Sequence, residues 1–195
     1  MIVPRYYEDL SILHEGTMPA RAYYIPASKR MDHLAEHREE SDRIQFLNGN
    51  WKFRFFQSIY DVQEPFYEPG YDTSDFGEIS VPGVWQMAGY DSHQYTNIRY
   101  PFPFDPPFVP QDNPCGAYVH TFDYVKDGQA PKAYLNFEGV DSCFYLWLNG
   151  TWIGYSQVSH ATSEFDVTSA LKEGENTIAV LVLKWCDGSY LEDQD

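Results

Sequence analysis

One spacing of side chains in this sequence matches a catalytic metal motif, His33-x-x-Glu36-His37. On an α-helix the two histidines, at positions i and i+4, share one face and could bind zinc, as in one class of zinc peptidases. Zinc catalysis also needs a third protein ligand and apolar surroundings with oriented hydrogen bonds. The neighbours from Arg30 to Glu40 are mostly charged and suited to solvent, so we expect a chance match and no zinc site.

Carboxylates are the most abundant reactive groups, with 29 Asp and Glu against 13 Lys and Arg and a formal charge of −16. A pair of them could hydrolyse a glycoside, at a separation of about 5 Å for retention and about 6.5–9.5 Å for inversion. The number of acids alone identifies no such pair. A chain this acidic repels the phosphate backbone of nucleic acids and the head groups of anionic lipids. We therefore expect neither nucleic acid nor a membrane as a partner, whereas neutral sugars remain possible ligands.

The cysteines Cys115, Cys143 and Cys186 are odd in number and widely spaced. This pattern argues against a disulfide framework and against a cysteine-rich zinc site. The first residues show no basic stretch followed by an apolar one, and no run of the chain approaches the length of a membrane span. We therefore expect a soluble protein of a reducing compartment, with the cytoplasm as the default location.

Aromatic side chains gather in residues 100–114, where Phe102, Phe104 and Phe108 alternate with closely spaced prolines. Proline at this density excludes a helix or a central strand, so the segment is expected to be irregular but ordered. The three rings could form a platform on which a sugar stacks. Packing of the loop against the rest of the domain is the simpler interpretation, and we favour it.

The elements that must position these residues are predicted to be β-strands. Residues 143–148 and 151–157 alternate in type and flank Asn149-Gly150, the strongest short signal for a hairpin with a type I′ turn. Asn149-Gly150-Thr151 is also a formal glycosylation acceptor, but only in a secreted protein, and the turn accounts for it fully. Residues 177–185 are apolar on both faces, which predicts a central strand. Further strands are expected from Leu47 to Phe55 and at residues 118–124, 133–138 and 163–167.

The chain divides near residue 45. Residues 1–45 contain Pro4, Pro19 and Pro26 and are predicted to form an extended arm and connector outside the packed core, with one short polar helix within residues 29–43. A surface loop is expected at residues 61–77, before the chain returns to the core at residues 81–85. Many short strands and few helices predict an all-β sandwich for residues 46–195.

Three stretches of the chain carry distinctive motifs. They are VPGVWQM (81–87), GYD (89–91), YTN (95–97) and YP (100–101), then PPFVP (106–110), NP (113–114) and Gly116, then FEGV (137–140), Trp147, NG (149–150), GYSQ (154–157), SEFD (163–166) and DGSYLEDQD (187–195). Together these motifs resemble one known family, the N-terminal sugar-binding domains of lac-type β-galactosidases of glycoside hydrolase family 2. The resemblance covers roughly residues 45–195, and it implies an all-β, galactose-binding-domain-like jelly-roll β-sandwich.

The resemblance implies residues for binding but none for bond cleavage. Asn97 and Asp195 match residues that hydrogen-bond the hydroxyls of galactose, and Asp195 also matches a sodium ligand. Gln157 and Asp187 match two ligands of a peripheral magnesium site. Its other ligands are expected from the arm, where Tyr6 stands in place of an acid and Asp9 in place of an asparagine. The catalytic glutamates of the family lie on a barrel further along the chain, and no residue here matches them.

The resemblance thus implies one domain of a β-galactosidase that hydrolyses terminal non-reducing β-D-galactose, as in lactose, with retention and with magnesium and sodium. Its partners would be the downstream domains of the same enzyme and further copies in a homo-oligomer, with the arm as an interface element. By itself the chain is expected to hydrolyse nothing. Two alternatives remain open: a free-standing carbohydrate-binding module or lectin-like domain, and a structural fragment that restores activity to a downstream polypeptide.

Overall fold

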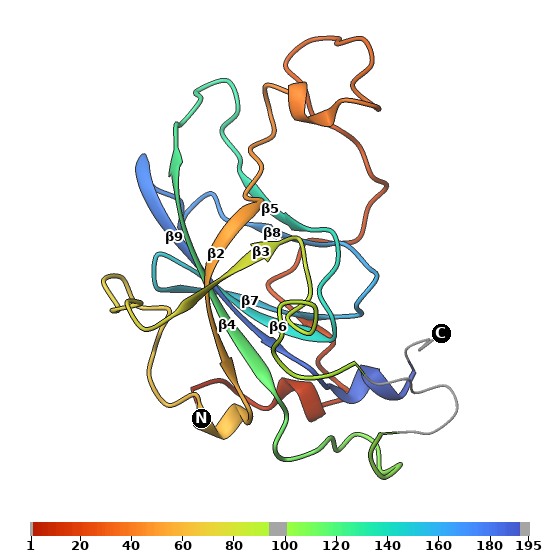
Figure 1. Cartoon of the computed structure of the whole chain (residues 1–195). Coiled ribbons are helices and arrows are strands. Elements are labelled where there is room, and N and C mark those ends of the chain that lie inside the picture. The colour runs from red at the N-terminus through yellow and green to blue at the C-terminus, as the bar shows by residue number, and fades with distance from the viewer. Residues whose placement is uncertain (1, 94–100, 192–195) are drawn as a thin grey trace.

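The computed structural model describes residues 2–93 and 101–191 (Figure 1). Its main element is an antiparallel sheet of seven strands in the order β1-β7-β6-β9-β4-β2-β3, and a second sheet contains β5 and β8. This is the all-β, sandwich-like architecture that the sequence predicts. The strands span β1 (His14–Glu15), β2 (Gly49–Phe56), β3 (Gly77–Val81), β4 (Cys115–Tyr124), β5 (Tyr134–Phe137), β6 (Cys143–Leu148), β7 (Thr151–Gln157), β8 (Ser163–Asp166) and β9 (Gly174–Leu183).

Helical structure among the described residues is limited to four short 3-10 helices: η1 (Tyr6–Glu8), η2 (Arg38–Glu40), η3 (Ile59–Asp61) and η4 (Asp187–Tyr190). The polar helix expected within residues 29–43 is therefore reduced to the three residues of η2. This segment has no apolar stripe to bury, and a short polar helix is marginal in water without tertiary packing. In the described part of the chain, no helix has the length and hydropathy needed to cross a bilayer.

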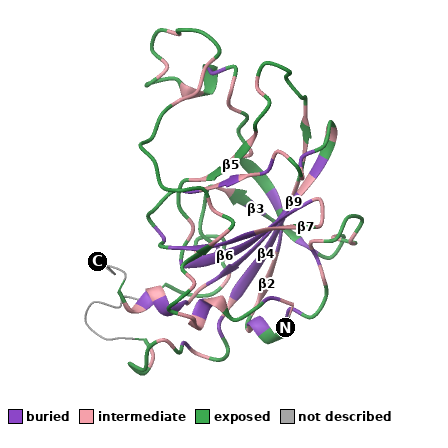
Figure 2. Cartoon of the chain, turned by 180° about the vertical axis from the view of Figure 1, so that it is seen from behind, coloured by how far each residue is buried: buried purple, intermediate pink, exposed green. Residues whose placement is uncertain are grey.

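Strand β9 occupies the middle of the large sheet, as its apolar residues on both faces predict. It pairs with β4 from Cys115↔Leu183 to Tyr124↔Gly174 and with β6 on its other side. Successive residues of a strand point to opposite faces, so Leu181 packs on one side of the sheet and Val180 on the other. Figure 2 shows the resulting centre of buried strands.

The hairpin of β6 and β7 confirms the turn prediction. Asn149 and Gly150 both have positive φ angles, 53° and 78°, as a type I′ turn requires. A side chain at Gly150 would meet the ring of Pro69 at 2.6 Å, so the position also demands the absence of a Cβ. The turn therefore fixes the register in which β7 runs back along β6.

One face of the large sheet is covered by the N-terminal residues and by the loop after β2. Val3 and Tyr7 of the arm are buried there, so the expectation that the arm stays outside the packed core is wrong for these residues. Further along, β1 adds to the sheet beside β7. The predicted surface loop at residues 61–77 likewise contributes Val62 and Phe66 to this core, because the sheet is apolar on both faces and needs a cover on each. The division of the chain into residues 1–45 and 46–195 stays a prediction.

Strand β3 is an element that the sequence pattern did not predict. It pairs with β2 through Trp51↔Ile79, between the loop expected at residues 61–77 and the expected return to the core at residues 81–85, and Ile79 is buried. The single buried side chain among polar neighbours gives too short an alternation to identify a strand. The chain then enters the core at Trp85, as expected.

The second face of the large sheet packs against β5 and β8. Phe165 of β8 is fully buried and contacts the rings of Phe137 and Phe144. This small sheet has two strands where the large one has seven, so the sandwich is strongly asymmetric.

Candidate functional site

Two of the predicted metal ligands, Gln157 and Asp187, lie together at one edge of the domain. Gln157 is the last residue of β7, and Asp187 is the first of η4, which follows the central strand β9. Their relative solvent exposures are 2% and 3%. Gly188 allows this approach, because a Cβ there would lie 2.8 Å from Oε1 of Gln157.

The carboxylate of Asp187 is only half satisfied. Its Oδ1 accepts a hydrogen bond of 3.0 Å from the N–H of Gly188, whereas Oδ2 is buried without a hydrogen-bond partner among the described residues. Burial raises the pKa of Asp187, and the negative charge of Asp9 adds to this rise. The side chain of Gln157 and the Gly188 N–H act in the opposite direction. A buried carboxylate with one unpaired oxygen is a site where a cation is stabilising.

From its position in the sequence alone, Gln157 could be an ordinary exposed residue of a strand. In the structure it is buried. Its Nε2 donates to the carbonyl oxygen of Ile12 at 3.3 Å, and its Oε1 accepts from Sγ of Cys186 at 3.3 Å. The arm, β7 and the start of η4 therefore meet at this side chain. Sequence reasoning did not single out Ile12, because its contribution is a main-chain oxygen that no side-chain pattern signals.

The two arm residues named for the magnesium site behave differently. Asp9 lies close enough to Asp187 to raise its pKa, and Asp9 itself accepts two hydrogen bonds from Ser11, at 2.6 and 3.0 Å. These bonds lower the pKa of Asp9. Tyr6 instead places its hydroxyl near Glu15 of β1, and this hydrogen bond raises the pKa of Tyr6. Asp9 thus adds negative charge near Asp187, and Tyr6 has a partner on the neighbouring strand.

These oxygen donors fit magnesium better than zinc. The pocket combines the carboxylate of Asp187 with the amide of Gln157 and the main-chain carbonyl of Ile12, and the negative charge of Asp9 lies near it. Magnesium prefers hard oxygen ligands, usually one or two carboxylates, and keeps several waters. Within residues 2–93 and 101–191, no three His, Cys, Asp or Glu side chains gather as a metal site. The His33 motif lies in exposed turns where His33 has a φ of 63°, so the one-sided helix that this zinc motif requires is not formed.

The predicted sugar-binding residues, Asn97 and Asp195, lie outside the described residues. Asp91 and Ser92, which precede Asn97 in the sequence, are bound by Lys184, the residue after β9. Lys184 donates from Nζ to Oδ2 of Asp91 at 2.5 Å and to the carbonyl oxygen of Ser92 at 3.3 Å. The Lys184 side chain is only 9% exposed, so this ion pair is largely shielded from solvent. Lys184 was not predicted as functional, and its place after an apolar strand is a weak signal.

The phenylalanines of the proline-rich segment divide between packing and exposure. The ring of Phe102 packs edge-on against Trp185 and Tyr190, with centroids 5.1 and 5.4 Å apart, as the packing interpretation predicts. Phe104 also meets Tyr190 edge-on but is 75% exposed, and Phe108 is 58% exposed. The Tyr190 hydroxyl donates to the carbonyl of Phe108, which fastens the segment to η4. Sugar stacking on the two exposed rings stays a prediction.

The fold and the pocket together define a class of domain. It is an all-β sandwich with a buried pocket of oxygen ligands where the N-terminal arm meets η4. Residues 44–195 match the family model described as glycosyl hydrolases family 2, sugar binding domain. The chain belongs to this family.

Among curated proteins, the chain is 49% identical over 195 residues to a β-galactosidase of Actinobacillus pleuropneumoniae. It is 45% identical over 196 residues to a β-galactosidase of Staphylococcus xylosus. Both alignments cover 100% of this chain but only 19% of the relative, so the chain spans about a fifth of their length.

Solved structures support the fold alone. A β-glucuronidase of Bifidobacterium dentium, complexed with coumarin-3-O-glucuronide, matches 70% of this chain and 19% of its own, with a TM-score of 0.51 and 23% identity. The apo β-glucuronidase of Ruminococcus gnavus matches 71% of this chain and 21% of its own, with a TM-score of 0.52 and 17% identity. At these identities the likeness concerns architecture and not substrate.

Proposed function

We propose that this chain is the substrate-side domain of a retaining β-galactosidase and contributes side chains to a galactose site without cleaving the bond. The observation that carries the proposal is the identity of 49% over the whole chain to a β-galactosidase, together with the DGSYLEDQD sequence at residues 187–195. The enzyme would release terminal β-D-galactose from substrates such as lactose, with its two catalytic glutamates on downstream domains.

In this proposal Asn97 and Asp195 recognise the sugar. A carboxylate accepts hydrogen bonds from two hydroxyls, while an amide both donates and accepts, so the pair can fix the orientation of one galactosyl ring. A site built from such groups discriminates against sugars that lack a matching hydroxyl, because its polar atoms would be left unpaired. Asp195 would in addition ligate sodium, with the remaining ligands on the downstream domains. The Lys184–Asp91 ion pair supports the proposal by fastening the chain that leads to Asn97.

Magnesium has a structural role in this proposal. Asp187 and Gln157 would hold the ion from the sandwich, with Asp9 and the Ile12 carbonyl oxygen from the arm. A bound divalent cation supplies positive charge that offsets the repulsion of two neighbouring carboxylates. Shared coordination of the ion would hold the arm against the start of η4. Oligomer contacts made by the arm would then depend on the bound ion. Three free, buried cysteines are compatible with a cytoplasmic location.

The proposal is tested on the full-length enzyme with a nitrophenyl β-galactoside. Asn97→Ala is expected to raise KM and lower kcat/KM by about 10- to 100-fold, the effect of losing one or two good hydrogen bonds to substrate. Asn50→Ala, at an exposed position on β2, is the matched control and should leave both constants unchanged. Equal kinetics for the two variants would contradict the assignment of Asn97.

The alternative of a free-standing carbohydrate-binding module is separated by calorimetry. Galactose and lactose titrated into the 195-residue chain should give very weak binding or none, because most contacts of the site lie on other domains. Purified 195-residue chain should also release no nitrophenol. Tight binding of either sugar by this chain would favour the module, and restored activity on mixing with the downstream polypeptide would support a complementing fragment.

A further inference from the structure

The asymmetry of the sandwich leaves a large cleft, with a volume of about 1580 Å³, that is lined by both sheets and by the segment between Arg21 and Asn48. Its lining includes Phe122 and Tyr124 of β4 and Leu135 and Phe137 of β5. These four apolar side chains face the interior of the sandwich, yet each is only partly buried. A sandwich core normally packs such side chains to the density of a crystal, so the space is unfilled by the described residues.

One wall of the cleft is an unpaired strand edge. The N–H of Val167 donates to the carbonyl of Ala133, and antiparallel pairing alternates along a strand, so Leu135 and Phe137 direct their backbone groups toward β8. Tyr134 and Asn136 therefore direct theirs to the opposite edge. In the part of the chain that the structure describes, no backbone hydrogen bond is made there. An open edge of this kind is a template for another strand.

The opposite edge of the small sheet is already covered. Thr17 of the arm forms a bridge with Phe165, and the N–H of Met18 donates to the carbonyl of Glu164 at 2.7 Å. The arm thus closes the β8 side and leaves the β5 side open. Among the described residues of the small sheet, the free edge of β5 is therefore the one that offers backbone hydrogen-bonding groups to an incoming strand.

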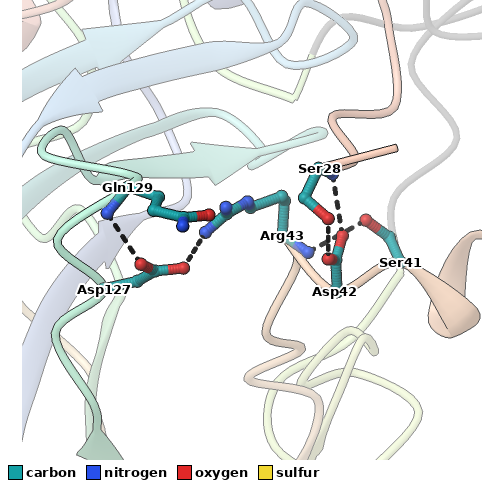
Figure 3. A network of polar contacts seen from close by, with 6 residues as sticks. All are labelled: Ser28, Ser41, Asp42, Arg43, Asp127 and Gln129. Carbon is teal, nitrogen blue, oxygen red and sulfur yellow. Dashed lines mark hydrogen bonds and ion pairs between the residues drawn. The ribbon is translucent and has the colours of Figure 1, made fainter. Parts of the chain in front are cut away.

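Charges on the rim of the cleft are paired within the domain. Arg43 bridges from the connector to Asp127, while its neighbour Asp42 accepts from Ser28 (Figure 3). Other rim cations are paired in the same way, in the ion pairs Arg21–Glu164, Arg38–Glu138 and Lys132–Asp166. A charged ligand would have to break these pairs, whereas an apolar strand needs none of them. The cleft thus offers apolar surface and a backbone edge, which is the chemistry of β-strand addition.

We propose that this cleft is filled by a β-strand from the polypeptide that follows Asp195, paired antiparallel or parallel with β5 and with alternate apolar side chains directed at Phe122 and Tyr124. The matched relatives are long enough to supply such a segment, because this chain covers only 19% of their length. The strand completes the small sheet and joins this domain to the rest of the enzyme. The inference depends on the chain being part of a longer protein and not on galactoside chemistry.

The test measures thiol reactivity in the full-length enzyme. Leu135→Cys places a thiol at a half-buried position on the cleft wall, and Ile153→Cys, at a half-buried position of β7 that does not line the cleft, is the matched control. If a strand fills the cleft, the Leu135→Cys thiol should react with a disulfide reagent at least about tenfold more slowly than the control, because labelling requires the strand to leave. In the same samples, hydrogen exchange of peptides covering β5 should show Tyr134 and Asn136 protected along with Leu135 and Phe137.

Each other occupant gives a different result, and each would overturn the proposal. Reaction of Leu135→Cys as fast as Ile153→Cys would mean an open cleft. Protection of the thiol without protection of the Tyr134 and Asn136 amides would mean a cover other than a paired strand. Protection that appears only with lactose would mean a sugar site. Protection that disappears on dilution would mean a second copy. Hydrolysis of a nitrophenyl galactoside by the same samples reports separately on the proposed function.

Discussion

Asp187→Asn is the substitution that tests the oxygen-donor pocket most directly. The residue is buried, its Oδ2 has no hydrogen-bond partner among the described residues, and burial raises its pKa. Because the folded pKa lies above the unfolded one, this group stabilises the fold fully below its unfolded pKa, and that contribution is lost as the pH rises through the folded pKa. At neutral pH without a divalent cation, the ionised carboxylate therefore destabilises the domain. The proposed magnesium ion, once bound, would offset this loss.

The size of the effect follows from linkage. Magnesium at about 100 times its dissociation constant would stabilise the folded state by about 2.7 kcal/mol. For a domain of this length each kcal/mol raises Tm by about 2–4 °C, so the expected shift is about 5–11 °C. Asp187→Asn should abolish most of the shift, because the amide keeps the shape of the side chain but loses its charge. Without magnesium at pH 7 the variant should melt at or above the temperature of the parent.

The assay is thermal unfolding with and without magnesium between pH 4 and pH 8. Asp75→Asn, which removes an acid from an exposed ion pair with Arg54, is the matched control and should keep the full magnesium shift. A magnesium shift of the same size in Asp187→Asn would refute the reasoning, because the ion would then bind elsewhere. So would a parent protein whose stability without magnesium rises steadily from pH 4 to pH 8 relative to the variant.

Three further predictions concern packing and charge. Gly154→Ala would place its Cβ 2.1 Å from a carbonyl oxygen of β1, so the variant should lose about 1–3 kcal/mol of stability in urea unfolding. Its control is Gly128→Ala, where nothing lies within 4 Å of the added Cβ, and this variant should change stability by less than about 0.5 kcal/mol. Lys184→Met should cost about 1–3 kcal/mol and raise KM of the full-length enzyme, because it strands a shielded carboxylate. Lys52→Met, which breaks an exposed pair, should cost under about 1 kcal/mol, and equal losses for the two would contradict the role of burial. Phe165→Ala, fully buried between the sheets, should cost about 3–5 kcal/mol, and a loss below about 1 kcal/mol would mean that the small sheet contributes little to the core.

Local patterns predicted the strands well where the turn chemistry was strong. Asn149-Gly150 located β6 and β7 to the residue, and the two-sided apolar run located the central strand β9. Elements held by distant contacts were harder to predict. Strand β3 is stabilised by its pairing with β2, and Val3 is buried by a sheet formed much later in the chain, so neither leaves a local signature.

The candidate site shows the same division. Resemblance selected Gln157 and Asp187, and the structure brings them together in a buried pocket. The Ile12 carbonyl oxygen and the engagement of Tyr6 by Glu15 depend on how the arm folds back across β7, which no spacing in the sequence encodes. The side chains of this pocket could therefore be predicted from the sequence. The main-chain oxygen of Ile12 and the pairing of Tyr6 with Glu15 could be found only from the structure.

The position of β9 in the sheet has a consequence for synthesis of the protein on the ribosome. The strand that both β4 and β6 require as a partner, Gly174–Leu183, is the last of the described strands to be translated. Until it emerges from the exit tunnel, β4 and the β6–β7 hairpin have no neighbour between them, and their apolar faces stay exposed in the nascent chain. Pairing between such distant segments forms slowly and exposes the chain to aggregation. Slower elongation before residue 174 should therefore lower the soluble yield, whereas a pause placed after β9 has left the tunnel should raise it.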